Sequence, residues 1–401
     1  MVDVFLPFKI PIKILTIMGL WQEKGTSWIY RFYGWCMHLF LVEILLLCQL
    51  MYVTIYESPE ELSDCLSLLF TYVGFFIKSI NLIYKINDLK DLLQMLGELE
   101  KLSEVDKTLE RTVLIKEVYR VHKYFKGLWF SNLSSCFLAA FIPFYYGSLL
   151  KTPFTMWTPF DQKNNIYGFL ATCAYQIFNV FCACSIVISM DILPLLCFNI
   201  GSGFIKELGV RFSKMTITNN QLTDDEYLEE LLKCIEIHLK IKEFAMKTQS
   251  IFSPMILVQG FISTLIMCTT SFTLVSFKIN IYCLKFNIIQ LLHQIQTGLK
   301  EVSPIIKGIS YLFAMTLQIF IPCYFGNEIL ISSQHLSMDL FHSDWTSKSH
   351  EFKVAMKLFM ENTKKPIKIT AFGVFEVNLV TFTSICNSAF SLYAVFKNVY
   401  N

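Results

Sequence analysis

Polar side chains lie inside the long apolar runs of this 401-residue chain, where few such groups are expected. The last apolar run, from Val374 to Phe396, carries small and hydroxyl residues at regular intervals: Thr381, Thr383, Ser384, Ser388, Ala389, Ser391 and Ala394. A helix that faces lipid has little use for so many polar atoms, whereas a helix that packs on neighbours or lines water uses them. We therefore interpret this run as the functional helix of the molecule.

Two ionisable residues also lie within apolar runs. Lys78 stands near the expected cytoplasmic end of its run, so its long stem is predicted to reach the lipid headgroups. Asp191 lies near the inner end of another run, beside Pro194, with no evident partner cation at its depth. We expect Asp191 to be a structural hydrogen-bonding group, with a transport carboxylate as the alternative.

Catalytic and metal-binding patterns are missing from the sequence. No nucleophile–base constellation, Gly-rich phosphate loop or His/Cys ligand cluster occurs, and the seven His residues are scattered. The 13 Cys residues form no C-x-x-C pair and fall mostly in apolar runs, which favours small buried thiols over a disulfide framework. We therefore expect no enzyme activity, no metal and no cofactor. The net charge of +2 gives no reason to invoke nucleic acid.

Composition places the chain in a lipid membrane. Hydrophobic residues make up 54% of it and charged residues only 16%, against about a quarter in soluble domains. We predict an all-α polytopic membrane protein without a signal peptide in Met1–Lys24. Seven windows are long enough to span a bilayer: Tyr30–Tyr56, Leu62–Tyr84, Leu128–Leu150, Tyr167–Ile200, Ile251–Phe277, Ile305–Ser332 and Phe372–Phe396.

The distribution of basic residues predicts the orientation. Lys and Arg concentrate in the N-terminal segment and in the connections after the second, fourth and sixth windows, while the alternate connections hold few. The positive-inside rule then places the N-terminus, residues 1–29, in the cytoplasm and the C-terminus outside the cell. This orientation is the reverse of that of a G-protein-coupled receptor.

Amphipathic stretches flank several windows. Leucines recur every three or four residues after Lys85, and a capping box at Thr223–Glu226 opens a helix that runs to Ser250. We expect long helices that continue the spans into the cytoplasm. The polar stretch Lys278–Pro304 fits an interfacial helix. The chain is predicted to form one unit, 1–401, in which 346–401 comprises a cytoplasmic helix and the last span.

Four groups of residues resemble the insect odorant receptor family. They are Cys323-Tyr-Phe-Gly-Asn-Glu328 with Trp345; Lys365-Pro-Ile-Lys-Ile-Thr with Val377-Asn-Leu-Val-Thr-Phe382 and Ala389-Phe-Ser-Leu-Tyr-Ala-Val-Phe396; Pro153-Phe-x-x-Trp157-x-Pro-Phe-Asp161 with Tyr175-Gln176; and Gly19-Leu-Trp21. Together these groups span the whole chain. The stretch 278–304 departs from the family pattern because it is longer than usual.

The resemblance implies an odorant-binding subunit of a ligand-gated, non-selective cation channel. In this family, tuning subunits form a hetero-tetramer with a shared co-receptor in the plasma membrane of olfactory sensory neurons. Cytoplasmic helices hold the subunits together as an anchor, and the last span lines the pore. By motif position, Val395 resembles the hydrophobic gate residue and Asn398 a polar residue that flanks it toward the outside.

The resemblance also implies an odorant pocket in the outer half of the bundle. The corresponding stretches offer Leu69, Phe70, Val73, Phe137, Phe141, Thr172, Tyr175, Phe313 and Met315. This apolar and aromatic set suits a small volatile molecule that is bound mainly by shape and burial. Taken one at a time, each of these residues fits an ordinary core position better than a ligand contact, and the hypothesis rests on the set.

Three alternatives remain open at this stage. A gustatory receptor would carry a Thr-Tyr and then a Gln-Phe pattern where this chain has Ser391-Leu392 and Asn398-Val399. The co-receptor itself would have a longer connection than Gly201–Ser250. A secondary transporter would show internal repeats with paired broken helices, and we find no such pairing.

Overall fold

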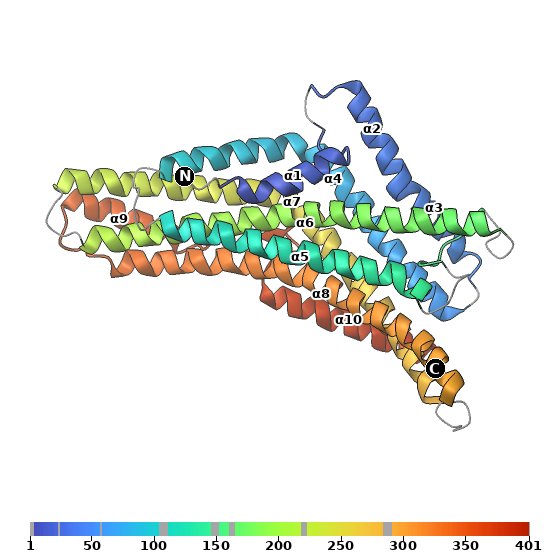
Figure 1. Ribbon diagram of the computed structural model, residues 1–401. Coiled ribbons are helices and arrows are strands. Elements are labelled where there is room, and N and C mark those ends of the chain that lie inside the picture. Colours follow the sequence, from blue (N-terminus) through green and yellow to red (C-terminus); the bar gives the residue numbers. More distant parts are fainter. Residues whose placement is uncertain are drawn as a thin grey trace.

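Five long helices dominate the protein in a computed structural model (Figure 1). The structure describes residues 4–22, 25–56, 58–103, 111–145, 152–159, 165–217, 223–283 and 291–400, and covers only the backbone at the helix ends 138–145, 214–217, 275–283, 291–305 and 396–400. The long helices are α4 (Pro59–Ser103), α5 (Arg111–Tyr145), α6 (Ile166–Ile217), α7 (Asp224–Cys283) and α8 (Leu291–His342).

These helices are long enough to extend well beyond a bilayer core, as the sequence predicts. Helix α7 has 60 residues, about 90 Å of helix, which is roughly three times the thickness of a bilayer core. The predicted capping box opens it, because the Thr223 backbone N–H donates to Glu226 Oε2 at 2.7 Å. Helix α4 carries the leucine pattern without a break, and Leu89, Leu92, Leu96 and Leu99 are fully buried.

Shorter elements complete the chain. The first predicted span consists of α2 (Trp28–His38), the π-helical turn η1 (Leu39–Glu43) and α3 (Ile44–Val53). The others are α1 (Leu6–Ile17), α9 (His350–Thr363), strands β1 (Thr370–Ala371) and β2 (Phe375–Glu376), and α10 (Leu379–Tyr400).

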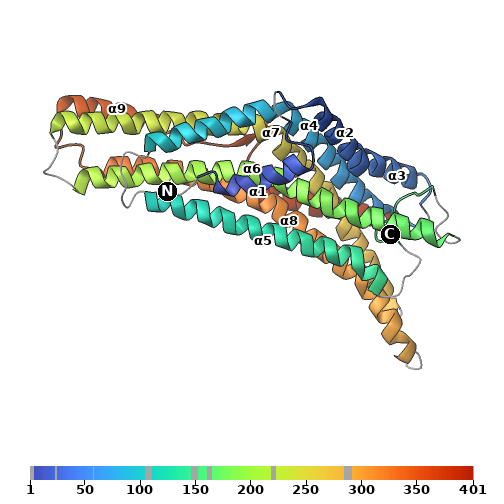
Figure 2. The same cartoon turned by 45° about the horizontal axis from the view of Figure 1, so that its top comes forward.

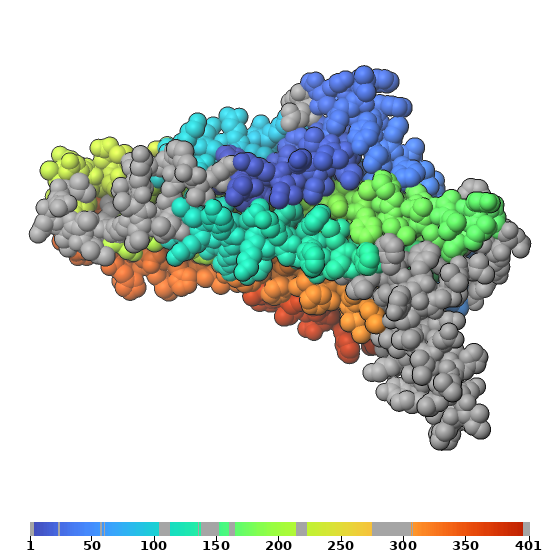
Figure 3. Space-filling view, in the orientation of Figure 1, coloured from blue at the N-terminus to red at the C-terminus, as the bar shows by residue number. Residues whose placement is uncertain are grey.

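The long helices lie side by side in an elongated bundle (Figures 1 and 2). Helix α4 packs on α7, and α6 packs on both α5 and α8. Helix α10 packs on α7 and α8 in only one half of the bundle, and α9 lies at the opposite end (Figure 1). Helix α1 lies on the surface along α6 and α5 (Figure 3). Its own side chains Phe8 and Leu15 point inward and are buried.

The helices have the length and composition that membrane spans require. Within the described residues, five helical stretches are long and apolar enough to cross a membrane: Trp28–Val53, Glu61–Ser103, Ile166–Ser213, Asp224–Leu274 and Gly308–His342. Leu379–Val395 is a shorter apolar helix. The all-α membrane fold that the sequence predicts is therefore confirmed.

The predicted interfacial helix at 278–304 is wrong for the part that the structure describes. Residues up to Cys283 continue α7, and residues from Leu291 onward already belong to α8. The ends of the two helices project from the bundle as a pair (Figure 1). Periodic apolar residues at 281–295 indicated a helix but could not show that it would join the flanking spans.

The last span begins later than predicted. A short hairpin occupies the expected start, since Thr370 pairs with Glu376 and Ala371 pairs with Phe375. Its turn requires positive φ angles, which Phe372 (51°) and Gly373 (72°) adopt. Asn378 Oδ1 then accepts the Thr381 N–H at 2.9 Å and caps α10. In the sequence, Gly373 and Asn378 mark this boundary, because glycine readily adopts positive φ and asparagine favours the N-cap of a helix.

The hairpin is fixed to the neighbouring long helices. Gln249 of α7 exchanges two hydrogen bonds with Thr370, at 2.9 and 3.1 Å. On the other side, Gly326 of α8 lies against the Val377 carbonyl so closely that an added Cβ would come within 3.0 Å of it, a distance that real Cβ atoms essentially never show. The glycine of the Cys323–Glu328 motif therefore exists to let the linker before α10 approach α8.

Substitution of this glycine tests the contact. We expect Gly326→Ala to lower the free energy of unfolding by about 1–3 kcal/mol, because the backbone of Val377 must move. Gly127→Ala in α5 is the matched control, since a Cβ there meets no atom within 4 Å. Alanine at 127 should be neutral or stabilising by up to about 1 kcal/mol. Thermal unfolding of both detergent-solubilised variants measures the difference, and equal effects would contradict the contact.

Candidate functional site

Helix α10 has one packed face and one open face. Phe382, Ile385 and Ala389 pack against α7 and α8, and Phe382 makes an edge-on ring contact with Phe320 at 5.3 Å. The opposite side of the helix is exposed along its length. The residues on it recur at spacings of three and four: Val380, Thr383, Ser384, Asn387, Ser388, Ser391 and Val395. We call this set the open stripe.

The open stripe is mostly polar. Ser384, Ser388 and Ser391 donate their hydroxyl protons to carbonyls one turn back, at 2.9–3.0 Å. Their oxygens retain acceptor lone pairs that point away from the rest of the chain. Such a surface is poorly suited to lipid and well suited to water or to a hydrated cation.

The two predicted gate residues lie toward the C-terminal end of α10. Val395 is 60% exposed and belongs to the open stripe. The backbone of residue 398 continues the same helix, seven positions after Ser391 and therefore in the same register, whereas the Asn398 side chain lies outside the described residues. The sequence prediction of a functional last helix thus corresponds to a distinct surface of the molecule.

The predicted odorant-binding residues differ in burial. Leu69, Thr172 and Met315 are buried, and Phe70 packs in the same cluster as Met315. Val73 and Tyr175 are partly buried. Phe137 and Phe313 are 54% and 59% exposed on the outside of their helices. The Phe141 side chain lies outside the described residues.

A hydroxyl seam that the sequence analysis missed runs beside these residues. Ser63, Ser67 and Thr71 are spaced by four on α4 and meet α7 and α8. Ser67 Oγ lies 2.7 Å from Thr269 Oγ1, Ser63 Oγ donates to the Thr269 carbonyl at 2.9 Å, and Thr71 hydrogen-bonds to Tyr311. The outer half of the bundle is therefore less apolar than the nine predicted residues suggested.

A second polar group fixes the π-helical turn in the first span. Tyr175 donates to the Phe40 carbonyl at 2.9 Å, and Asn179 Nδ2 donates to the Leu41 carbonyl at 2.9 Å. Tyr72 from α4 donates to Asn179 Oδ1. A π turn displaces carbonyls from regular helix bonding, and these side chains satisfy them. Tyr175 thus contributes its hydroxyl to the fold while its ring remains beside the outer half of the bundle.

A buried ion pair joins the middle of the bundle, which corrects two predictions. Lys78 Nζ lies 2.6 Å from Asp191 Oδ1, and the Lys78 side chain is only 3% exposed. Lys78 does not reach the headgroups, and Asp191 does have a partner cation. Lys78 also donates to Gln259 Oε1, and Gln318 Nε2 donates to Asp191 Oδ2. We call these four residues, which come from α4, α6, α7 and α8, the polar cluster.

The error has a physical reason. From the sequence, the depth of a residue in the membrane can be measured only from the end of its own apolar window. The windows that contain Lys78 and Asp191 are offset from each other along the bundle, and only the fold shows this offset. A lone lysine and a lone aspartate in neighbouring spans were a sufficient signal for pairing, because an unpaired charge in a membrane interior is costly.

A second ionic group lies near the inner ends of the spans. Lys206 Nζ bridges Glu117 Oε1 at 2.9 Å and Glu328 Oε2 at 3.0 Å, and Arg120 donates to Tyr324. The group ties α5, α6 and α8 together and uses two residues of the Cys323–Glu328 motif.

No cluster of three or more His, Cys, Asp or Glu residues in metal-binding geometry occurs in the part of the chain that the structure describes. The described residues that carry polar chemistry are instead hydroxyls, amides and paired charges between helices. These groups suit hydrogen bonding, ion passage and helix coupling.

Removal of one partner of the buried pair should be more harmful than removal of both. We expect Lys78→Met and Asp191→Leu each to lower the free energy of unfolding by about 3–5 kcal/mol, since each leaves an uncompensated buried charge. The double variant should lose less than either single variant. The control is Lys85→Met on the same helix, whose partner Asp88 is 46% exposed and whose loss should cost at most about 1 kcal/mol. Thermal unfolding in detergent checks the order, and additive losses would contradict it.

Comparison with known proteins adds independent information. The chain is 27% identical to Odorant receptor 94a of Drosophila melanogaster over 63% of this chain and 59% of that protein. It is 21% identical to Odorant receptor 23a of the same species over 91% of this chain and 90% of that protein. The matched stretch therefore spans less than two thirds of the length of the first of these relatives. Receptors of this kind are not enzymes, which confirms the expectation of no enzyme activity.

The fold is also found among solved structures. The olfactory receptor OR5 from the insect Machilis hrabei, in complex with eugenol, superposes with a TM-score of 0.74 at 17% identity, over 98% of this chain and 97% of that chain. The family model described as 7tm Odorant receptor matches residues 58–390, which include the polar cluster, the Cys323–Glu328 motif and most of the open stripe. The chain therefore belongs to the odorant receptor family of insects.

Proposed function

We propose that this protein is the odorant-binding subunit of a heteromeric, ligand-gated, non-selective cation channel. The observation that carries the proposal is the open stripe of α10, a polar helix face that no other described part of the chain covers. A polar face has no stable place against lipid, so it requires water or protein beside it. In one chain the stripe faces outward, and therefore a pore requires several chains arranged around it.

Assembly with other subunits has support at the opposite end of the molecule. Met338 and Phe341 at the end of α8 and Leu358 on α9 are each more than 60% exposed, in the part that the basic residues assign to the cytoplasm. Exposed apolar side chains in water favour contacts with other chains. We propose that this region is the anchor, and that the partner is the family's co-receptor in a hetero-tetramer at the plasma membrane of olfactory sensory neurons.

A small apolar volatile is the proposed ligand, bound in the outer half of the bundle. The structurally similar receptor OR5 was solved in complex with eugenol, a small aromatic molecule of this kind. In this chain the buried or partly buried members of the predicted set, Leu69, Phe70, Val73, Tyr175 and Met315, offer aromatic and aliphatic surface. The nearby hydroxyl seam offers hydrogen-bonding groups to an oxygen-bearing ligand.

Gating follows from unequal affinity. A ligand opens the channel only if it binds the open arrangement of the bundle more tightly than the closed one. The outer half connects to α10 through α7 and α8, because these two helices contact both the hydroxyl seam of α4 and the packed face of α10. In the closed state Val395 and the corresponding residues of the other subunits would form a ring that dewets the pore, and Asn398 would partly solvate a cation beside it.

Co-expression tests the proposal directly. We expect no odorant-evoked current when the chain is expressed alone in cells that lack the co-receptor, and a cation current when both are present. The measurement is whole-cell current during application of a panel of small volatiles. A large current from the lone chain, or ligand uptake without current, would contradict the channel-subunit function.

The gate assignment makes a separate prediction. Val395→Ser should raise the ligand-independent current of the assembled channel several-fold, since a polar side chain weakens dewetting at a narrow point. The matched control is Val380→Ser, which alters the same residue type on the same stripe at the other end of α10 and should leave this current unchanged. Both currents are normalised to the amount of receptor at the cell surface. Equal leak in both variants, or none in either, would remove the gate from position 395.

A further inference from the structure

A small cavity lies beside the polar cluster. It opens between α6, α7 and α8, and its wall includes Phe375 of the hairpin and Ile385 of α10. Asp191 on this wall is 16 residues along α6 from Tyr175, which corresponds to about 24 Å. On α8 the two sites lie closer together, because Met315 of the predicted odorant set stands one turn before Ile319 and packs in the same cluster as Ile319 and Cys323.

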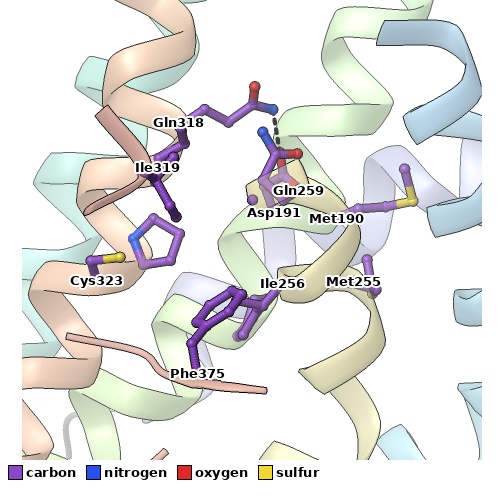
Figure 4. Close-up of a pocket in the computed structure, with 13 residues that line it drawn as sticks. Met190, Asp191, Met255, Ile256, Gln259, Gln318, Ile319, Cys323 and Phe375 are labelled. Carbon is purple, nitrogen blue, oxygen red and sulfur yellow. Dashed lines mark hydrogen bonds between the residues drawn. The ribbon is translucent and has the colours of Figure 1, made fainter. Parts of the chain in front are cut away.

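One side of the cavity is polar and carries charge. Asp191, Gln259 and Gln318 line it together, and Gln318 reaches across from α8 to hydrogen-bond the carboxylate (Figure 4). The Asp191 side chain is 20% exposed, whereas Lys78 behind it is only 3% exposed. The carboxylate is thus the charged group that faces the cavity.

Counting hydrogen bonds shows what this wall still offers. Gln259 is committed on both sides, because its Oε1 accepts from Lys78 and its Nε2 donates to Ser263 at 2.6 Å. Each Asp191 oxygen accepts one hydrogen bond and has capacity for another. Gln318 Oε1 accepts none from the described residues. The wall therefore has more free hydrogen-bond acceptors than free donors, and the second amide proton of Gln318 lies beside these acceptors.

The remaining walls are apolar and adaptable. Met190, Met255, Ile256 and Ile319 surround the space, with Pro322 and Cys323 on the α8 side. Methionine side chains adjust their shape to small ligands at little cost. A small ligand pocket that is apolar apart from a few convergent polar groups matches the general form of binding sites for small molecules.

We propose that this cavity binds a short-chain alcohol. The hydroxyl group donates its proton to Asp191 Oδ2 or Gln318 Oε1, accepts the free amide proton of Gln318, and places its alkyl chain among the methionine and isoleucine side chains. A carboxylate ligand is excluded by charge repulsion from Asp191. An alkane or an ether leaves the acceptors unpaired and lacks the donor that the wall selects.

Occupancy of this site acts on the last helix. Gly260 of α7 lies where an added Cβ would meet Phe375 at 3.3 Å and Ile385 at 3.6 Å, so the hairpin and α10 close this side of the cavity in direct contact with α7. A molecule in the cavity therefore presses on the hairpin that leads into α10 and on α10 itself. Occupancy of the site thereby modulates gating, and its ligand need not be the odorant.

The test uses Cys323 as a reporter, because its side chain is 3% exposed and lines the cavity. Membranes that contain the full-length chain are treated with methyl methanethiosulfonate, and the modification rate at Cys323 is followed by mass spectrometry. 1-Butanol is titrated against diethyl ether, an isomer that lacks the O–H donor. We expect 1-butanol to slow the reaction saturably, by about threefold at twice its Kd. Its apparent affinity should exceed that of the ether about tenfold.

Two controls sharpen the result. Cys173, which is equally buried but lies in the outer half of α6, should react at a rate that neither probe changes. Gln318→Leu keeps the side-chain size, leaves the Lys78–Asp191 pair in place, and should reduce the preference for alcohol over ether by about threefold or more. Equal protection by both probes, failure of Cys323 to react at all, or an unchanged preference in Gln318→Leu would overturn the proposal. None of these readouts requires channel activity, so they are independent of the proposed function.

Discussion

The ion pair between Lys78 and Asp191 constrains the whole bundle. A charge in the interior of a membrane protein must be paired, and here the pair also recruits Gln259 and Gln318. The four residues come from four different helices, so α4, α6, α7 and α8 can slide past one another only if this group breaks. Nonpolar packing alone would allow neighbouring helices to shift with little penalty. The polar cluster thus fixes the register of the helices at one depth and divides the bundle into two halves, which the predicted orientation makes the outer and the inner half.

The two halves are held together by different chemistry. In the outer half, neutral hydroxyls and amides link the helices, as in the pairs Ser67–Thr269 and Tyr175–Phe40. In the inner half, Lys206 joins Glu117 and Glu328 through two charged contacts. Neutral hydrogen bonds are individually weaker than charge-assisted ones. The half in which we propose that ligand binds is therefore the half that can rearrange more easily, while the inner half keeps its geometry.

The sequence was sufficient for the regular parts of this fold. Apolar windows, leucine spacing in α4 and the capping box at Thr223 each reflect local periodicity, and local periodicity is what a single chain displays. It was insufficient where distant residues meet. Lys78 and Asp191 are far apart in the chain, and their pairing depends on how two helices are offset. The same limit applies to the predicted odorant residues, because the sequence could not show that Phe137 and Phe313 face outward.

The hairpin before α10 is an intermediate case. The residue types Gly373 and Asn378 are typical of a turn and a helix cap, but only the close approach of Gly326 to Val377 shows why the linker lies where it does.

The position of α10 completes the physical argument. Its packed face is held by α7 and α8, and the linker that leads into it is clamped by Gln249 and Gly326. Its other face carries hydroxyls that point away from everything in the described chain. A helix fixed so firmly on one side cannot turn its polar residues inward to hide them. The polar face must then be covered by water, and water within a membrane requires further protein around it. The single chain is in this sense incomplete, and the arrangement of its last helix is itself the strongest reason to expect an assembly.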